Sequence, residues 1–391
     1  MPVDAYRACS PSETFDRVAP FLGRLGITRL ARQTGLDDIG IPVWCAYTPN
    51  AKAVVIAQGK GMDDDAAKTS AVMEAIERSV ATNPACKRVL TNRAWLEEQG
   101  ELVFSLDLLL SPHARAVAPS EDIEWMQAEQ LLTSHRPWLP FEAIHLDRTL
   151  ENPRYWRSSD GLASGNTRDE ALLHAVLERV ERDALTLWQV TPARKRYHSA
   201  IDPKTIEYPD IQQALEKIAG AGLEIALFDI TTDLAIPCVV ALLGPKNRSR
   251  GQVRHVDITL GAGASLSALA AASRAITEAV QSRMTFIAGA RDDLLPNMFV
   301  RKADPSTLLA MEAEACRDFQ TLPSLNVTPG TSPLETVLAR LGTSGITQLY
   351  AVDLAPDWLP AFVVKVIAPQ LENPDGDRHR RFGNRALSRA L

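Results

Sequence analysis

The 391-residue sequence lacks the features that mark membrane and secreted proteins. No uninterrupted apolar stretch approaches the length of about 20 residues that a membrane-spanning helix needs. The first residues, MPVDAYRACSPSETFDRV, show no cationic segment followed by an apolar run, so no signal peptide is predicted. The five cysteines stand far apart without a C-x-x-C pair, which excludes a disulfide framework and a cysteine zinc site. We therefore expect a cytoplasmic protein that binds no membrane.

A basic footprint for nucleic acid is also absent, since the net charge is −6 and no basic run is dense. The closest candidate is the arginine-rich end of the chain, which we expect to be solvated or to face a partner protein rather than nucleic acid. Its arginines are Arg378, Arg380, Arg381, Arg385 and Arg389. The P-loop pattern G-x-x-x-x-G-K-[ST] does not occur, and no local signature of a Ser-His-Asp or Cys-His nucleophile site is recognisable.

What the sequence does contain is one polar pattern carried by three helix-length segments. They are Ser70-x3-Glu74-x2-Glu77, His174-x3-Glu178-x2-Glu181 and Arg274-x3-Glu278-x2-Gln281. The central glutamates are 104 (178 − 74) and 100 (278 − 178) residues apart. Positions 0, +4 and +7 lie on one side of a helix, so each segment presents a narrow polar stripe.

The rest of each helix circumference is almost entirely apolar, which predicts helices that are mostly buried. Buried glutamates are costly unless they are paired or bound to metal. Hard oxygen ligands favour Mg²⁺, which commonly bridges carboxylates to phosphate oxygens. Nearby basic residues could neutralise such phosphates; they are Lys60, Arg78, Arg182, Arg274 and Arg283. The stripes thus predict a site for divalent cations and a polyphosphate.

A purely structural interpretation is that internal Glu–Arg ion pairs tie the helices together. Glu74/Arg78 and Glu178/Arg182 have the i,i+4 spacing of such pairs. Three stripes in register favour a shared site over this alternative. His174 is either a polar ligand or a structural histidine.

Each striped segment follows a β-rich segment entered through a proline and then a small-residue loop, which opens the helix. The strand-like parts are 40–47 with 53–56, 139–145, and 236–243 with 255–260, and the loops are 59–61, 161–166 and 261–263. Residues 349–367 repeat only the strands. We predict one pseudo-repetitive α+β domain, in which strand-plus-helix units surround a shared centre. Residues 101–135 and 284–345 are predicted to be helical inserts. The expected division is an N-terminal extension (1–24), the domain (25–372) and a polar, mobile tail (373–391).

Several of these motifs, in this order, resemble the YcaO family. They are Gly35-Leu-Asp-Asp-Ile-Gly-Ile-Pro42, Gly59-Lys-Gly61, the three striped segments and Gly161-Leu-Ala-Ser-Gly-Asn-Thr167. A further segment, Gln281-Ser-Arg-x5-Gly-Ala-Arg-Asp-Asp293, resembles stand-alone members that pair with a TfuA-type protein and form thioamides. The resemblance covers about residues 25–372. It implies an ATP- and Mg²⁺-binding YcaO-like fold that activates a peptide backbone amide by phosphorylating its oxygen and releases ADP and phosphate.

The resemblance also implies roles for individual residues. Glu74, Glu77, Glu178 and Glu181 would be Mg²⁺ ligands. Lys60, Ser70, His174, Arg182, Arg274, Glu278, Gln281 and Arg283 would contact the nucleotide or its phosphates. Glu74, Glu178 and Arg283 are the residues to which we assign catalysis.

The product and the partner are left open by the resemblance. Azoline-forming members often end in a proline-rich tail, whereas this sequence ends Arg-Ala-Leu-Ser-Arg-Ala-Leu391, so thioamide formation is slightly favoured over cyclodehydration of Cys, Ser or Thr. A separate partner protein is expected, either TfuA-like or activating-enzyme-like. Alternatives are a non-catalytic nucleotide-binding regulatory protein and an amide-bond ligase. A homodimer is compatible with the sequence, although no feature demonstrates it.

Overall fold

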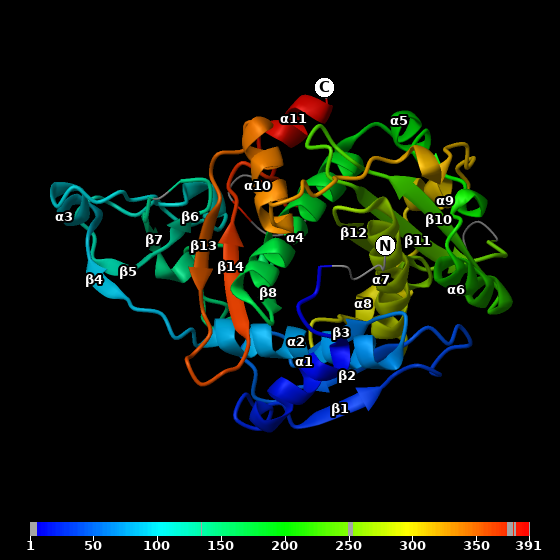
Figure 1. Ribbon diagram of the computed structural model, residues 1–391, viewed down its shortest axis with the longest axis horizontal. Helices are drawn as coiled ribbons and strands as arrows, with labels where there is room; N and C mark the ends of the chain where they lie inside the picture. The colour runs from blue at the N-terminus through cyan, green and yellow to red at the C-terminus, as the bar shows by residue number, and fades with distance from the viewer. Residues whose placement is uncertain (1–5, 134, 249–252, 374–377, 379–380, 391) are drawn as a thin grey trace.

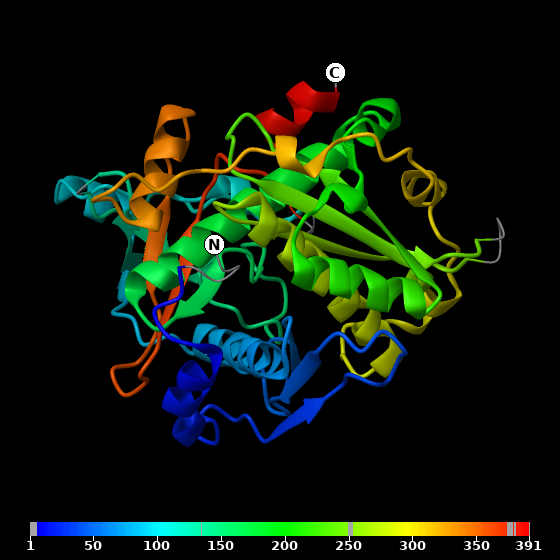
Figure 2. The same ribbon diagram turned by 45° about the vertical axis from the view of Figure 1, so that its right-hand side comes forward.

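The three striped segments form long helices that surround the centre of the molecule. The computed structural model describes residues 6–133, 135–248, 253–373, 378 and 381–390. The helices are α2 (Asp64–Thr82), α4 (Arg168–Val190) and α7 (Ala268–Ala288). Figures 1 and 2 show them around a common centre with β-sheets on the outside. The predicted α+β fold with strand-plus-helix units is confirmed.

Each of the three helices packs on its own antiparallel sheet, and the strand just before the helix is always an edge strand of that sheet. Behind α2 lie β1 (Arg29–Arg32), β2 (Val43–Tyr47) and β3 (Ile56–Lys60), in the order β1-β2-β3. Behind α7 lie β12 (Thr259–Ala264), β11 (Cys238–Pro245), β10 (Leu223–Asp229) and β9 (Ala200–Ile201), in that order. Asp63 and Thr167 cap the N-termini of α2 and α4 by accepting from the N–H groups of Ala66 and Glu170.

The C-terminal strands, which have no striped helix of their own, complete the sheet behind α4. This sheet has the order β6-β13-β14-β8, with bounds Glu129–Gln130, Tyr350–Asp353, Phe362–Ile367 and Leu162–Gly165. The pairing of β14 with β8 places Phe362 opposite Gly165 and Lys365 opposite Leu162. The middle unit is therefore assembled from two distant parts of the chain.

The three units are connected in a ring. Besides its own sheet, α2 contacts β8, α4 contacts β12, and α7 contacts β3, so each helix reaches the leading strand of another unit. Two side-chain bonds reinforce this closure: Ser164 of β8 donates to Glu77 at 2.6 Å, and Gln281 donates to the carbonyl of Gln58 in β3. The arrangement turns all three polar stripes inward.

The small-residue segments before the helices are largely strand residues, so their prediction as loops is wrong. A Cβ added to Gly59 would lie 2.0 Å from the backbone nitrogen of Ala71, and one added to Gly261 would lie 2.2 Å from the carbonyl oxygen of Ala275. Gly165 is equally confined, 2.6 Å from the nitrogen of Ala171. Glycine is needed because the helix backbone lies directly on the strand.

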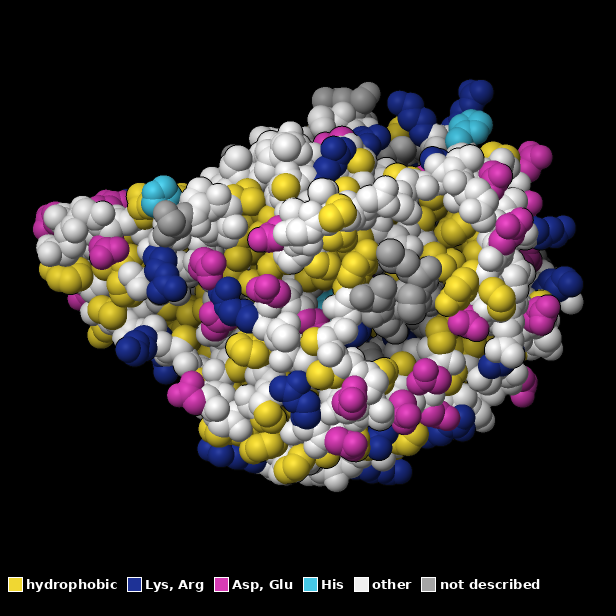
Figure 3. All heavy atoms as spheres, in the orientation of Figure 1, with side chains coloured by type: hydrophobic (Ala, Val, Ile, Leu, Met, Phe, Trp, Pro, Cys, Tyr) yellow, Lys and Arg dark blue, Asp and Glu magenta, His cyan; other side chains and the backbone are white. Residues whose placement is uncertain are grey.

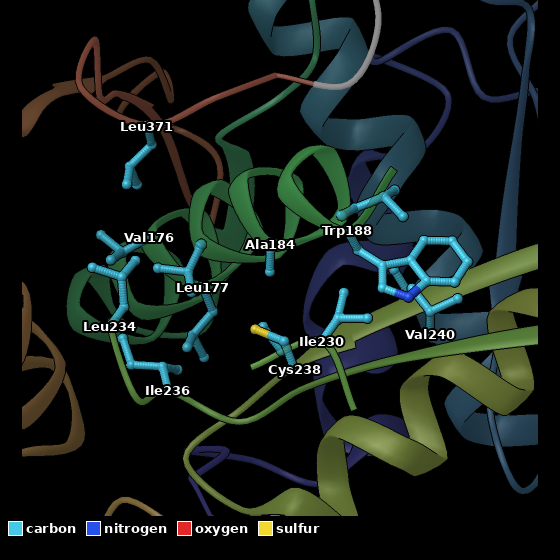
Figure 4. Close-up of a cluster of buried hydrophobic side chains, with 14 of the residues drawn as sticks. Val176, Leu177, Ala184, Trp188, Ile230, Leu234, Ile236, Cys238, Val240 and Leu371 are labelled. Atoms are coloured by element: carbon cyan, nitrogen blue, oxygen red, sulfur yellow. The ribbon is translucent and has the colours of Figure 1, made fainter. Parts of the chain in front are cut away.

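Away from its polar stripe, α4 is embedded in the largest apolar cluster. Figure 4 shows Val176, Leu177, Ala184 and Trp188 gathered against side chains of β11 and the segment before it. Those partners are Ile230, Leu234, Ile236, Cys238 and Val240. Burial of this kind stabilises by roughly 25 cal/mol per Å² of apolar surface, so packing of the α4 side chains fixes the position of its glutamates.

The segment 101–135 is not a helical insert. It contributes one short 3₁₀ turn (Asp107–Leu109), β6 and β5 (Ile123–Gln127), and β5 joins β4 (Val89–Thr91) and β7 (Trp138–Pro140) in a small sheet beside α3 (Arg93–Glu98), at the left of Figure 1. Pro112 and Pro119 interrupt the apolar run that suggested a helix, because proline removes a helical N–H donor. Segment 284–345 confirms the prediction of a helical insert only in part, since irregular chain joins its short helices α8 (Pro296–Val300), α9 (Pro305–Met311) and α10 (Pro333–Thr343).

Other helices lie on the outside of this framework. They are α1 (Pro11–Val18), α5 (Ala193–Tyr197), α6 (Pro209–Gly220) and α11 (Asn384–Ala390). Within the described part of the chain, no helix has both the length and the apolar character needed to cross a bilayer. On the face shown in Figure 3, basic and acidic side chains are interspersed.

The described part of the C-terminal segment is anchored to α4, so a mobile tail is not what the structure shows there. Arg385 forms ion pairs with Asp183 at 2.9 Å and with Asp233 at 2.8 Å. Glu372 accepts from the N–H groups of Gly383 and Ala386. The side chain of Asp183 is fully buried, and a buried carboxylate requires a cationic partner. Arg380 and Leu391 lie outside the described residues.

Candidate functional site

The inward-facing stripes bring five glutamates and several basic side chains together. Arg182 lies at the centre of this cluster, because its guanidinium is attracted by four carboxylates: Glu181, Glu178, Asp160 and Glu278. Glu77 is repelled by Glu74 and by Glu178, and Glu181 is repelled by Glu278. The glutamates of α2, α4 and α7 therefore share one electrostatic environment, as the stripes predicted.

Ion pairs engage four of these carboxylates. Arg78 lies 2.5 Å from Glu74 and also donates to the carbonyl of Ile56. Arg182 lies 3.7 Å from Glu178 and 3.9 Å from Glu181. Lys60 of β3 pairs with Glu278 of α7, across the ring. The i,i+4 pairs of the structural interpretation thus do form, but they lie inside a larger cluster contributed by all three units.

Burial of these glutamates disfavours the ionised form of their carboxyl groups. Burial raises the pKa of Glu77 to about 8; the hydrogen bond from Ser164 opposes this rise, and repulsion from Glu74 and Glu178 adds to it. Burial likewise raises the pKa of Glu178 to about 7 against the opposing effect of Arg182. The pKa of Glu181 is raised by burial and then by Glu278. Burial also acts on Glu278, but Lys60 and Arg182 outweigh it and lower its pKa.

These carboxylates suit a hard divalent cation, although they do not form a finished coordination shell. Among the described residues, no group of three or more His, Cys, Asp or Glu side chains is already arranged as metal ligands. Arginine and lysine hold several of the carboxylate oxygens instead. Glu77, Glu178 and Glu181 have raised pKa values, first because they are buried and also because neighbouring carboxylates repel them. Oxygen donors with uncompensated charge fit Mg²⁺.

One end of the stripes forms a polar rim. His174 Nδ1 lies 3.4 Å from the guanidinium of Arg274, which confirms that the first positions of the α4 and α7 stripes meet. Burial, with Arg7 and Arg274, lowers the pKa of His174 well below its ordinary value, so this histidine is neutral and can accept a hydrogen bond. Ser70 holds the corresponding position on α2.

The N-terminal extension lies beside this rim. Arg7 pairs with Glu170 of α4 at 3.1 Å, and the Thr69 hydroxyl of α2 donates to the carbonyl of Pro11 at 2.8 Å. Glu170 is one helical turn before His174, and Thr69 adjoins Ser70. Residues 7–11 therefore connect α4 to α2 next to the positions predicted to contact nucleotide.

The structure does not bring Arg283 to the glutamates, and its catalytic role stays a prediction. Its guanidinium pairs with the buried Asp37, with Nε 3.2 Å from the carboxylate. Arg283 is five residues after Glu278 and so lies about 140° around the helix from it. Gln281 does remain on the inner side, where it donates to the carbonyl of Gln58 in β3.

Three charged residues of the site were not singled out from the sequence. Asp160 lies 3.6 Å from Arg182 and 3.9 Å from Arg179. Lys365 is buried in β14 near Asp160 and Glu178, and burial lowers its pKa to about 8. Arg291 pairs with Asp293 and is close enough to Glu74 to be attracted by its charge. Lys365 did carry a signal, because it is the one polar residue in the strand Phe362–Ile367. Arg291 lay within a motif that supported the family resemblance.

The raised pKa values predict a pH dependence of Mg²⁺ binding. Below pH 7 to 8, Glu77 and Glu178 hold protons in the metal-free protein, and these must leave before the carboxylates bind metal. Affinity for Mg²⁺ should therefore fall as the pH decreases from 8 to 6, by up to about tenfold per pH unit for each carboxyl. Calorimetry in buffers of different ionisation enthalpy should show proton release on binding, and Glu77→Gln should reduce it. Affinity that is independent of pH in this range would exclude these residues as ligands.

Comparison with protein families gives a match along most of the chain. The model described as YcaO cyclodehydratase, ATP- and Mg²⁺-binding, matches residues 58–372. An uncharacterized protein of the tfuA 3′ region from Rhizobium leguminosarum bv. trifolii is 36% identical over 98% of this chain and 92% of its own length. An uncharacterized protein of Methanothermobacter thermautotrophicus is 32% identical over 94% of this chain and 95% of its own length.

Solved structures share the fold at lower identity. The YcaO protein of Methanopyrus kandleri bound with AMPPCP and Mg²⁺ superposes with a TM-score of 0.73 at 20% identity, over 95% of this chain and 94% of that one. A heterocyclase in complex with substrate and cofactor gives a TM-score of 0.75 at 21% identity over 95% of this chain. The chain spans 53% of that heterocyclase.

Proposed function

Because the chain belongs to the YcaO family, we propose that it uses ATP and Mg²⁺ to phosphorylate the oxygen of a peptide or protein backbone amide, in the course of thioamide formation. The observation that carries this proposal is the convergence of five glutamates from three helices, with basic side chains among them. A helix bundle held together by ion pairs alone has no need for several buried carboxylates whose pKa values are raised, first by burial and then by mutual repulsion.

The stripe residues divide into two roles in this proposal. Glu74, Glu77, Glu178 and Glu181 hold Mg²⁺, and Glu74 and Glu178 are the two assigned to catalysis. Lys60, Ser70, His174, Arg182, Arg274, Glu278 and Gln281 bind the nucleotide. Bound Mg²⁺ supplies positive charge to the phosphate oxygens. Arg182 and Lys60 add cationic hydrogen-bond donors, and neutral His174 orients the guanidinium of Arg274.

The third stripe differs from the other two in a way that fits this division. Glu278 is flanked by Arg274 and Gln281 and is neutralised by Lys60, so its pKa is lowered while those of Glu77, Glu178 and Glu181 are raised. A carboxylate that already has its cation is a poor metal ligand. The α7 stripe is therefore assigned to the nucleotide rather than to Mg²⁺.

A sulfur nucleophile completes the proposed reaction. Hydrosulfide, or a donor of equivalent sulfur, adds to the amide carbon, the oxygen leaves as phosphate, and the amide C=O becomes C=S while ATP becomes ADP. The relative from the tfuA 3′ region supports a TfuA-like partner, which would present the substrate. The heterocyclase fold neighbour keeps azoline formation as the alternative product, with a Cys, Ser or Thr side chain as the nucleophile.

The experiment is co-expression of the full chain with the protein and any short peptide encoded beside its gene, followed by mass spectrometry. Exchange of oxygen for sulfur in the peptide is expected, with ADP and phosphate as nucleotide products. Loss of one water from the peptide would instead identify an azoline-forming enzyme. AMP as the nucleotide product, or nucleotide binding without turnover under every partner condition, would contradict the proposal.

A further inference from the structure

The segment Ser158–Gly161 forms a tight turn, closed by a hydrogen bond from the N–H of Leu162 to the carbonyl of Ser159, and it bonds both to Lys365 of β14 and to Glu178 of α4. Gly161 has φ +76°, and its carbonyl accepts from the N–H of Val366 in β14 at 2.7 Å. A Cβ at this glycine would lie 2.2 Å from the carbonyl oxygen of Val366. The turn is therefore pressed against the strand and has little room to shift.

The turn presents one backbone donor to the metal-site carboxylate. The N–H of Gly161 lies 3.0 Å from Oε2 of Glu178. The other oxygen, Oε1, lies 3.7 Å from Arg182, which is a weak contact. One carboxylate oxygen is thus fixed from behind, and the other remains available for a cation.

Lys365 holds the opposite side of the same turn. Its ammonium group donates to the carbonyls of Ser158 and Asp160, both at 2.6 Å. The residue is 6% exposed in a strand whose neighbours are apolar, so a methionine of similar length would fill the space without the cost of burying a charge. The amino group is therefore explained by the turn that it holds rather than by the packing of the strand.

We propose that Lys365 is a positioning residue for metal binding, because it fixes the Ser158–Gly161 turn and, through the Gly161 N–H, one oxygen of Glu178. The inference rests on the proposed function, in which Glu178 is a Mg²⁺ ligand. Carboxylates that bind metal are themselves hydrogen-bonded, and loss of such an outer partner lowers metal affinity by about 10- to 100-fold. The charged groups around Lys365 are Asp160, Glu178 and Arg179, and none of them replaces its bonds to the turn.

The test compares Lys365→Met with the wild-type protein and with the control variant Lys246→Met. Lys246 is exposed and lies outside both β14 and the Ser158–Gly161 turn. The quantity is the Mg²⁺ concentration that half-saturates binding of a non-hydrolysable ATP analogue, together with the Mg²⁺ dependence of ATP turnover. Lys365→Met should raise the half-saturating Mg²⁺ concentration by about 10- to 100-fold, with turnover largely restored at saturating Mg²⁺. Lys246→Met should match the wild type.

Two results would overturn the inference: an unchanged Mg²⁺ dependence, or turnover that falls equally at all Mg²⁺ concentrations. If Lys365→Met does not fold, Lys365→Leu carries the same test, because it also removes both donated hydrogen bonds; failure of both variants to fold would assign the lysine to stability instead. Glu178→Gln is measured in parallel. If Glu178→Gln leaves Mg²⁺ binding intact, the assignment of Glu178 as a metal ligand is wrong. If Glu178→Gln weakens Mg²⁺ binding but the Lys365 variants leave it intact, only the inference about Lys365 is wrong.

Discussion

Glu178→Gln is expected to lower Mg²⁺-dependent ATP turnover by on the order of 100-fold or more. The substitution keeps the size of the side chain and leaves an oxygen to accept from the Gly161 N–H. It removes the negative charge, and it replaces a second oxygen ligand by an NH₂ group that cannot bind a cation. Because α4 is buried by its apolar side chains, the backbone at position 178 should not move. Release of ADP and phosphate by purified protein is the measurement.

The matched control for this variant is Glu216→Gln. Glu216 is an exposed glutamate in the interior of another helix, α6, so the same chemical change there should leave turnover unchanged. Burial raises the pKa of Glu178 to about 7, so its negative charge is unfavourable in the folded, metal-free protein. Removing this charge in Glu178→Gln should therefore not destabilise the metal-free protein. Wild-type turnover in Glu178→Gln would exclude it as a metal ligand.

Gly261→Val is expected to prevent folding or to destabilise the protein by about 3 kcal/mol or more, the upper end of what overpacking costs. A side chain at position 261 would lie 2.2 Å from the carbonyl oxygen of Ala275 and 2.3 Å from the nitrogen of Ala279. Both are backbone atoms of α7, so relief requires the helix to move away from β12. That movement would also displace Glu278, which lies between these two alanines. Urea denaturation followed by circular dichroism measures the loss.

Gly220→Ala serves as the control for the glycine prediction. A Cβ at the C-terminal end of α6 meets nothing within 4 Å, and the φ of Gly220 is not positive. Helix propensity favours alanine over glycine by up to about 1 kcal/mol, so this variant should be as stable as the wild type or slightly more so. Equal stability of Gly261→Val and Gly220→Ala would mean that the close contact of strand and helix is wrong.

The sequence was sufficient for the three helices because their pattern is local. The spacing of Ser70, Glu74 and Glu77 and its two repeats predicted both the helices and the side of each that faces inward. The sequence could not reveal the role of Gly59, Gly165 and Gly261, since a glycine in a loop and a glycine pressed against a helix have the same local context. Only the packing of β3, β8 and β12 on their helices distinguishes the two.

Lys365 and Asp160, which lie beside the glutamates, could not be identified from the sequence for a related reason. Lys365 lies nearly 190 residues after Glu178 (365 − 178 = 187), and its bonds go to backbone carbonyls, which leave no trace in a sequence pattern. Asp160 precedes a motif that was recognised, but its partners Arg179 and Arg182 become visible only when β8 and α4 are folded together. Arg283 was predicted from its place in the motif, and its angle on the helix, about 140° from Glu278, was not taken into account.

The most direct test of the shared site is a crystal structure with Mn²⁺, in place of Mg²⁺, and a non-hydrolysable ATP analogue. Anomalous scattering locates Mn²⁺ without reference to the surrounding chain. We predict manganese bound between the α2 carboxylates Glu74 and Glu77 and the α4 carboxylates Glu178 and Glu181, with the Arg78–Glu74 and Arg182–Glu178 ion pairs opened and Glu278 still paired with Lys60. Manganese bound elsewhere, with those two ion pairs intact, would contradict the account.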